Sequence, residues 1–194
     1  MESQERPAFP EQIETERLIL RAPREGDGVE VNAAIRETYA DLHEWMEWAS
    51  YLPDVAETES RRQQARARFL AGEEFSIQAH LKTTGALAVC AALHPRDWTV
   101  PKFEIGYWCR AAYQGSGYVT ETVGTLTRLA FELFSANRIE IRCDARNLRS
   151  RRVAERAGYT LEASLKNDVV APDGVLRTTL IYVRFPTTSR DSGL

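Results

Sequence analysis

The sequence predicts one α/β domain in which helices cover the faces of a mixed β-sheet. A length of 194 residues suits a single domain. Hydrophobic residues make up 43% of the chain and charged residues 27%, which is typical of globular proteins that form a core without disulfides or metals. Segments with alternating apolar residues, typical of strands, are interspersed with segments whose apolar residues recur every three or four positions, typical of helices.

The two ends of the chain differ in composition from its middle. Residues 1–12 are polar and contain two prolines, which predicts a flexible N-terminal lead-in. The single domain is expected to cover residues 13–186, and a polar tail to cover residues 187–194. The first residues lack the basic and apolar regions of a signal peptide, and no run of about 18 apolar residues is present. We therefore expect a cytoplasmic location and no membrane partner.

The first half of the chain predicts a strand followed by helices. A short strand over residues 17–21 precedes a helix that Asp27 is expected to cap and that ends near Tyr39. A second, short helical segment is expected over residues 42–48, and a third helix over residues 57–71.

Strands and helices alternate through the rest of the chain. A hairpin over residues 75–93 and a strand over residues 103–109 precede a helix over residues 117–134, whose apolar residues recur in steps of four and three. The later elements are a strand, a helix that begins with a capping asparagine and a closing hairpin, over residues 138–144, 147–157 and 159–185.

The loop between the strand at 103–109 and the helix at 117–134 is the most informative segment. Gly115 and Gly117 allow positive φ angles and a close approach of the backbone to a ligand. The first N–H groups of the helix lack internal partners and, with the helix dipole, favour an anion such as a pyrophosphate. The alternative is an ordinary strand-to-helix turn. No Lys-Ser/Thr pair and no third glycine follow, which argues against a Walker loop and a dinucleotide fingerprint.

Residues 103–131 resemble motif A of the GNAT N-acetyltransferase superfamily. The motif, Gln/Arg-x-x-Gly-x-Gly/Ala, is matched by Gln114 and Gly117 and imperfectly by Val119. The resemblance extends over about residues 14–185, and further matching segments are residues 15–21, 42–49, 147–150 and 154–159. Residues 42–49, with two tryptophans, are similar to the RimJ/RimL branch, which acetylates N-termini of ribosomal proteins. The resemblance implies a mostly antiparallel central sheet of about seven strands with helices on both faces.

The resemblance also implies acetyl-CoA as co-substrate, without a metal. Backbone N–H groups of residues 114–119 would bind its pyrophosphate, and residues 107–110 would bind its pantetheine as an added strand. Arg151 or Arg152 would contact its 3′-phosphate, since seven arginines and three acids lie within residues 138–156; a solvated helix face is the alternative. The implied cofactor-binding residues are Tyr107, Trp108, Cys109, Arg110, Gln114, Gly115, Ser116, Gly117, Tyr118, Val119, Asn147 and Arg152.

Acetyl transfer to an amine requires removal of a proton from the amine and donation of a proton to the leaving thiolate. Glu104 is the candidate base, because it lies in the predicted central strand with apolar neighbours and burial would raise its pKa. The alternatives are a structural carboxylate or action through a water chain. Ala154 stands where many relatives carry a catalytic tyrosine, so Ser150 is the candidate proton donor; a role limited to the helix N-terminus is the alternative.

Three aromatic or imidazole side chains are candidates for contact with the acceptor. Trp45 and Trp48 would form a wall of its groove, and His43 adjoins them in the sequence. The alternative for the tryptophans is packing of the helices onto the sheet. The other two histidines, His80 and His94, show neither triad nor metal spacing and are typical of surface or partly buried polar groups.

The cysteines predict no zinc site and no disulfide framework, because Cys90, Cys109 and Cys143 lie far apart in apolar segments. None of them stands where a covalent acetyl intermediate would require it, which favours direct transfer in a ternary complex.

The sequence therefore predicts an acetyl-CoA-dependent N-acetyltransferase whose acceptor is a protein or peptide N-terminus. The alternatives are an enzyme for a small amine, such as an aminoglycoside or polyamine, and a non-catalytic CoA-binding regulatory module. A net charge of −3 argues against nucleic acid as a partner. The family resemblance also suggests a homodimer.

Overall fold

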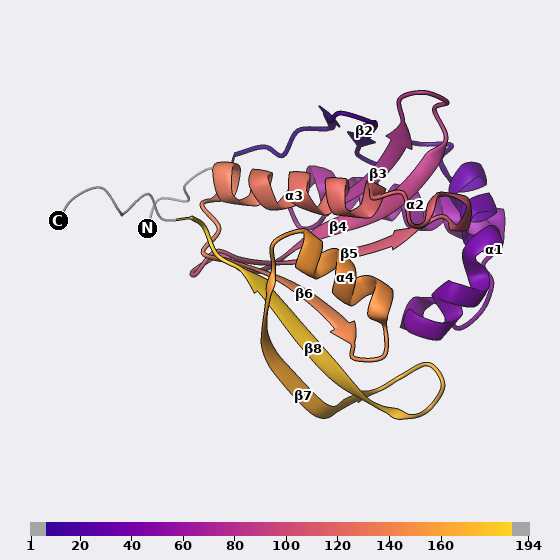
Figure 1. The fold of residues 1–194 in the computed structure, drawn as a ribbon. Coiled ribbons are helices and arrows are strands. Elements are labelled where there is room, and N and C mark those ends of the chain that lie inside the picture. Colours follow the sequence, from indigo (N-terminus) through magenta and orange to yellow (C-terminus); the bar gives the residue numbers. More distant parts are fainter. Residues whose placement is uncertain (1–6, 188–194) are drawn as a thin grey trace.

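Residues 7–187, which the computed structural model describes, form eight strands and four α-helices (Figure 1). In chain order they are β1 (Gln12–Glu14), β2 (Leu18–Arg21), α1 (Gly28–Trp45), α2 (Val55–Leu70), β3 (Phe75–Leu81), β4 (Leu87–Asp97), β5 (Lys102–Cys109), α3 (Tyr118–Phe134), β6 (Arg138–Asp144), α4 (Leu148–Arg156), β7 (Thr160–Val170) and β8 (Leu176–Arg184). Short 3₁₀ turns, η1 (Glu47–Ala49) and η2 (Ala111–Tyr113), follow α1 and β5.

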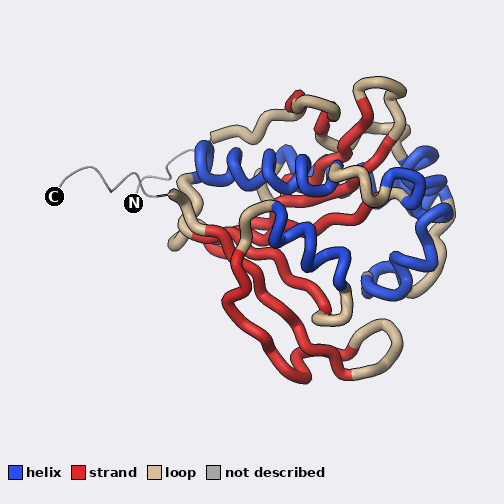
Figure 2. The backbone as a smooth tube through the Cα atoms, in the orientation of Figure 1, coloured by secondary structure: helices blue, strands red, loops and turns tan. Residues whose placement is uncertain are grey.

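The strands form one mixed sheet in the order β1-β2-β3-β4-β5-β6-β8-β7. All neighbouring strands are antiparallel except β5 and β6, which are parallel. Helices α3 and α4 lie on one face, and α1 and α2 lie on the other (Figures 1 and 2). The predicted fold class, a mostly antiparallel sheet with helices on both faces, is confirmed.

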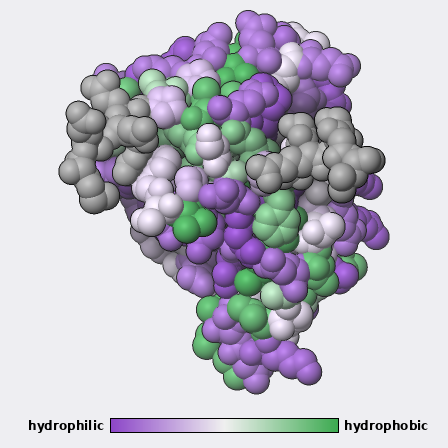
Figure 3. Space-filling model, turned by 90° about the vertical axis from the view of Figure 1, so that its left-hand side faces the viewer, coloured by the Kyte–Doolittle hydropathy of each residue, from purple (hydrophilic) through white to green (hydrophobic). Residues whose placement is uncertain are grey.

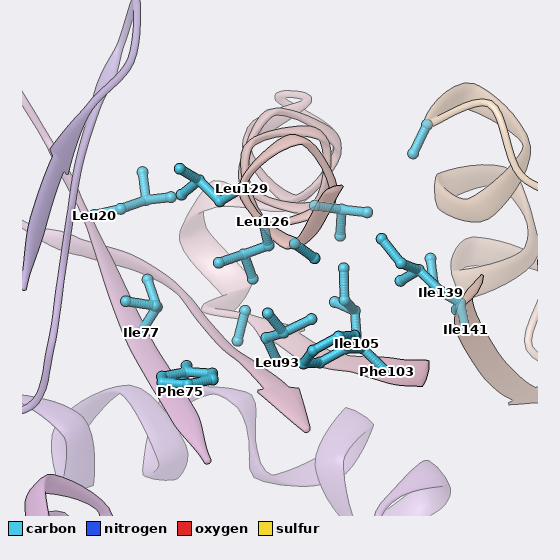
Figure 4. Packing of buried hydrophobic residues seen from close by; sticks show 14 of the residues in the cluster. Leu20, Phe75, Ile77, Leu93, Phe103, Ile105, Leu126, Leu129, Ile139 and Ile141 are labelled. Atoms are coloured by element: carbon cyan, nitrogen blue, oxygen red, sulfur yellow. The ribbon is translucent and has the colours of Figure 1, made fainter. Parts of the chain in front are cut away.

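The hydrophobic core lies between α3 and the sheet. Alternate residues of β3, β4 and β5 point toward the helix, among them Ile77, Leu93 and Ile105, and α3 presents Leu126 and neighbouring apolar residues to them (Figure 4). Each of these four side chains is at most 2% exposed. The steps of four and three in the sequence therefore mark the buried face of α3, as predicted.

The lead-in prediction is wrong for residues 7–12. Phe9 is buried and stacks on Phe75 and Phe134, with ring centroids 4.8 Å and 6.1 Å apart. Strand β1 begins at Gln12 and pairs with β2, which gives eight strands instead of about seven. Residues 1–6 and 188–194 of the predicted lead-in and tail lie outside the described residues.

Two helix boundaries differ from the prediction for local reasons. Helix α1 continues to Trp45 without the expected break near Tyr39, and Asp27 binds the guanidinium of Arg21 (2.7 Å) instead of capping the helix with its side chain. Helix α2 begins at Val55, because the carboxylate of Asp54 accepts a hydrogen bond from the N–H of Glu57 (2.7 Å).

The β7–β8 hairpin projects from the rest of the molecule (Figures 1 and 3). Strand β7 is at the edge of the sheet and pairs only with β8 among the described strands. The hairpin carries exposed apolar side chains, visible as green patches at the lower end of Figure 3. They are Leu161, Leu165, Val170, Val175 and Leu176.

Candidate active site

The two parallel strands at the centre of the sheet separate after a short paired segment. Residues 102–104 of β5 pair with residues 138–140 of β6, and beyond them the register contains no further pair. On its other side β5 stays bound to β4, and the N–H of Arg110 donates to the carbonyl of Ala88 (2.9 Å). Because hydrogen bonds alternate along an antiparallel strand, the backbone groups of Tyr107 and Cys109 face the opening between β5 and β6.

Two cavities meet at this opening. One, of about 540 Å³, lies between the end of β5, the start of α3, α4 and the end of α1; we call it the α3 cavity. The other, of about 1160 Å³, lies over β4, β5 and β6 on the side of α2; we call it the sheet cavity. The residues that line both cavities are Trp45, Met46, Tyr107, Trp108, Asn147 and Ser150. A reaction between ligands of the two cavities would take place at these residues.

The α3 cavity ends at a loop built for an anion. Gly115 and Gly117 have φ angles of 77° and 81°, and a Cβ at Gly115 would meet no atom within 4 Å. Among the described residues, the N–H groups of Gly115, Ser116 and Gly117 donate to no acceptor, and the first N–H groups of α3 have no partner within the helix. One loop beside the cavity therefore holds several unpartnered donors.

Arg17 holds this loop from the outside. Its guanidinium donates to the carbonyl of Ser116 (2.9 Å) and to the carboxylate of Glu121 (2.7 Å), and it lies over the ring of Tyr118 (4.6 Å). Although burial raises the pKa of the Glu121 carboxyl, hydrogen bonds from Thr15 and Arg17 lower it overall. The charged carboxylate therefore keeps the loop attached to β2.

The arginines of residues 138–156 have different roles. Arg138, Arg142, Arg146 and Arg149 form ion pairs with carboxylates. Arg152 and Arg156 line the α3 cavity without a carboxylate partner among the described residues. Arg151 donates to the carbonyl of Ala145 (3.3 Å) and does not line the cavity, so Arg152 is the better placed of the two expected phosphate contacts.

Two of the expected cofactor residues have other partners. The side chain of Gln114 donates to Asp41 (2.8 Å) and accepts from Arg149 (2.9 Å), and so connects the loop to α1 and α4. Arg110 binds Glu37 (2.6 Å) and does not line the α3 cavity. Ser116 does not line it either. The expected cofactor residues that do line the cavity are Tyr107, Trp108, Cys109, Gln114, Gly115, Gly117, Tyr118, Val119, Asn147 and Arg152.

Ser150 lies at the junction of the cavities and is hydrogen-bonded to a tyrosine. Its Oγ is 2.9 Å from the hydroxyl of Tyr107, and burial raises the pKa of Tyr107 above its ordinary value. The N–H of Ser150 donates to Oδ1 of Asn147 (2.9 Å), which confirms Asn147 as the N-cap of α4. Since Asn147 satisfies the backbone donor, the hydroxyl of Ser150 is not needed for capping. Ala154, one turn further, is buried in the core.

Glu104 faces the sheet cavity, but its surroundings differ from the prediction. Nε and Nη2 of Arg96 lie 3.2 Å and 3.1 Å from Oε2 of Glu104, so the expected apolar surroundings are wrong. Arg96 lies in β4, two residues after His94, which is the register partner of Glu104. Among the described residues, Oε1 of Glu104 has no hydrogen-bond or ion-pair partner, and Glu104 lines the cavity.

The sheet cavity contains a second polar group that was not predicted from the sequence. Oε2 of Glu74 lies 3.3 Å from Nδ1 of His94, and Oε1 accepts a hydrogen bond from Ser76 (2.7 Å). The hydrogen bond with His94 is the main reason that the pKa of Glu74 falls to about 2. Only the register of β3 and β4, which sets Phe75 opposite Leu93, brings Glu74 beside His94, so no local pattern in the sequence identified this pair.

The expected acceptor residues separate in the structure. Trp45 and Trp48 line the sheet cavity, and Trp48 lies near Trp108, with ring centroids 6.4 Å apart. His43 is on the exposed side of α1, where Nδ1 is 2.9 Å from the carbonyl of Ala49 and the ring stacks on Tyr39. His43 lines neither cavity, and its contact with the acceptor stays a prediction.

The cysteines are free, and Cys90 and Cys143 are buried, as expected. Cys109 lines the α3 cavity, and burial raises its pKa to about 11, so its thiol stays protonated at neutral pH. Within residues 7–187 no cluster of three or more histidine, cysteine or acidic side chains could hold a metal ion. No helix in the same range is long and apolar enough to span a membrane.

Comparison with known proteins identifies relatives of this chain. Residues 17–160 match the family described as acetyltransferase (GNAT) domain. A 106-residue segment is 34% identical to a Bacillus subtilis (strain 168) protein named "Putative ribosomal N-acetyltransferase YdaF"; it covers 55% of this chain and 57% of that protein's length.

Two solved structures share the fold at 22% sequence identity. The microcin C7 self-immunity acetyltransferase MccE, in complex with acetyl-CoA and AMP, has a TM-score of 0.84 over 92% of this chain and 98% of its own. The ribosomal L7/L12 α-N-protein acetyltransferase RimL, in complex with coenzyme A, has a TM-score of 0.83 over 90% and 98%.

Proposed function

The chain belongs to the GNAT acetyltransferase family, and on that premise we propose that it transfers an acetyl group from acetyl-CoA to a primary amine. The transfer would be direct, within a ternary complex, and the acceptor would be a protein or peptide N-terminus. The observation that carries the proposal is the meeting of two cavities at the open edge of β5, with Ser150 and Tyr107 between them.

The α3 cavity fits coenzyme A in its chemistry. The unpartnered N–H groups of the loop at residues 115–117 and of the first turn of α3 would bind the pyrophosphate. The free backbone groups of Tyr107 and Cys109 would bind the amide groups of the pantetheine, as an added strand does. Arg152 would bind a phosphate at the outer end. When bound there, acetyl-CoA supplies an activated thioester.

Proton transfer is assigned to Ser150 at the junction and to Glu104 in the sheet cavity. The hydroxyl of Ser150 would donate a proton to the leaving sulfur, and its hydrogen bond to Tyr107 fixes the orientation of Oγ. Glu104 would bind the ammonium form of the acceptor through Oε1, and is one of the groups that can remove its proton. The raised pKa of Cys109 supports transfer without an acetyl-cysteine.

The acceptor assignment follows from the sheet cavity and from the relatives. The sheet cavity is open to solvent near Trp48, which is 38% exposed, so it can admit the end of a polypeptide. YdaF and RimL carry ribosomal N-acetyltransferase activity in their names. The cytoplasmic location and the homodimer stay predictions.

An assay of CoA release against three classes of acceptor tests the proposal. Peptides with a free N-terminus, polyamines and aminoglycosides would be compared at equal concentration, with mass spectrometry of each product. We expect acetylation of the peptide α-amine. Faster transfer to a polyamine or an aminoglycoside would show that the acceptor is a small amine instead of a peptide N-terminus. If the protein binds acetyl-CoA but acetylates none of the three classes, it is a CoA-binding module.

A further inference from the structure

We propose that His94 takes the proton from the acceptor amine and that Glu74 positions His94 for this step. The inference rests on the proposed function, because it names the group that prepares the amine for attack. His94 and Glu74 both line the sheet cavity, on the side of the sheet where the acceptor would enter.

The position of Glu74 fixes the imidazole ring. Nδ1 of His94 lies 3.3 Å from Oε2 of Glu74, while Oε1 is held by Ser76 (2.7 Å) and lies 3.7 Å from Arg68. A carboxylate at Nδ1 favours the tautomer with its proton on that nitrogen, which leaves the lone pair on Nε2. The side chains of Glu74 and His94 are 22% and 29% exposed, so the contact is shielded but open to the cavity.

Gly106 provides the space for this ring. A Cβ at Gly106 would lie 3.5 Å from Nε2 of His94, so the ring covers the position of the missing side chain. Gly106 immediately precedes Tyr107, one of the residues at the junction of the cavities. Nε2 therefore lies over the backbone of β5, one residue before the junction.

The neighbouring charges favour separate roles for Glu104, which would bind the ammonium group, and His94, which would remove its proton. The charged groups around His94 are Glu74 with its neighbour Arg68, Arg96 on the same strand as His94, and Glu104 on β5. Glu104 uses Oε2 to bind Arg96, and its free Oε1 suits a hydrogen bond from an ammonium group. Oriented in this way, the ammonium would present an N–H to the neighbouring imidazole.

Removal of the proton by His94 frees the amine for attack on the thioester. Nε2 of His94 forms an N–H bond as one N–H bond of the ammonium breaks, and the freed lone pair of the amine attacks the carbonyl carbon. The C–S bond then breaks, the proton of Ser150 goes to the departing sulfur, and the second proton of the amine nitrogen goes to Oγ of Ser150. Imidazolium then returns its proton to solvent through the open side of the cavity, and Glu74 stabilises the charged ring in the interval.

Two substitutions of His94 test this role. In His94→Asn an amide nitrogen can keep the contact with Glu74 but no acceptor replaces Nε2, and His94→Gln serves as a second variant in case the first does not fold. We expect kcat/KM for the amine to fall by about 10²- to 10⁴-fold at pH 7, with acetyl-CoA affinity by calorimetry unchanged. The loss should shrink at high pH, where the acceptor is already a free amine.

Nuclear magnetic resonance of the wild-type protein gives a readout that does not require turnover. In ¹⁵N spectra the neutral His94 ring should carry its proton on Nδ1. Glu74→Gln should weaken this tautomer preference and reduce kcat/KM, and Glu74→Asp should restore part of both. A proton on Nε2, or wild-type rates and pH dependence in both His94 variants, would overturn the inference and leave the proposed function intact. A wild-type protein that acetylates no amine would refute both.

Discussion

Replacement of Glu74 by glutamine tests the polar group of the sheet cavity through stability alone. The carboxylate is 22% exposed, and its contacts lower its pKa from the ordinary 4.5 to about 2, chiefly through His94. A pKa shift of one unit corresponds to about 1.4 kcal/mol, so the charged form of Glu74 contributes at most about 3 kcal/mol to the free energy of unfolding. Because the folded-state pKa is the lower one, this contribution is complete above pH 4.5 and is lost as the pH falls toward 2.

The assay is urea unfolding of wild type and Glu74→Gln at pH 5.5 and pH 3.5. Wild type should be the more stable protein at pH 5.5, and its advantage in free energy of unfolding should be about 1 kcal/mol smaller at pH 3.5. At the lower pH the Glu74 carboxyl of the unfolded chain is mostly protonated, whereas that of the folded chain is still charged. Glu132→Gln is the matched control, since Glu132 forms an exposed pair with Arg128 and should change stability by less than about 1 kcal/mol. An equal difference at both pH values would refute the claim that charged partners hold this carboxylate.

Four further substitutions test the site and the core. Gly117→Asp should weaken acetyl-CoA binding by tenfold or more in calorimetry, because it adds a negative charge at the loop. The control Gly117→Asn is uncharged, and asparagine also tolerates positive φ, so this variant should bind acetyl-CoA within a few-fold of wild type. Equal affinities of the two variants would contradict the anion site. Ser150→Ala should lower kcat with acetyl-CoA affinity unchanged, and unaltered kinetics would remove Ser150 as proton donor. Glu104→Gln should raise KM for the amine more than it lowers kcat, and the opposite split would make Glu104 the base. Leu126→Ala should reduce the free energy of unfolding by about 2–5 kcal/mol in urea titration, and a loss below about 1 kcal/mol would show that α3 does not pack as described.

Local sequence patterns predicted the elements that are long and periodic. Helix α3 and strand β6 follow their apolar repeats, and β6 has the predicted bounds of residues 138–144. The three-residue strand β1 is too short to show a period, and the burial of Phe9 depends on aromatic rings from β3 and α3 that only the folded chain brings together. These features could not be read from neighbouring residues.

The candidate site likewise has a part that was predictable from the sequence and a part that was not. The loop at residues 115–117 was predictable because its glycines and the helix that follows are contiguous in the sequence. The partner of Glu104 was not, because Arg96 reaches it across the register of β4 and β5. Glu74 and His94 meet only after β3 and β4 have paired, so no spacing rule along the chain would connect them.

The early separation of β5 from β6 has a consequence for how this protein can evolve. Main-chain amides and carbonyls exposed along β5 are identical in every amino acid except proline, so recognition through them does not depend on which side chains the strand carries. Under the proposed function, the β5 side chains that face the sheet cavity would be free to change with a new acceptor, while binding of the acyl donor would be inherited with the backbone itself.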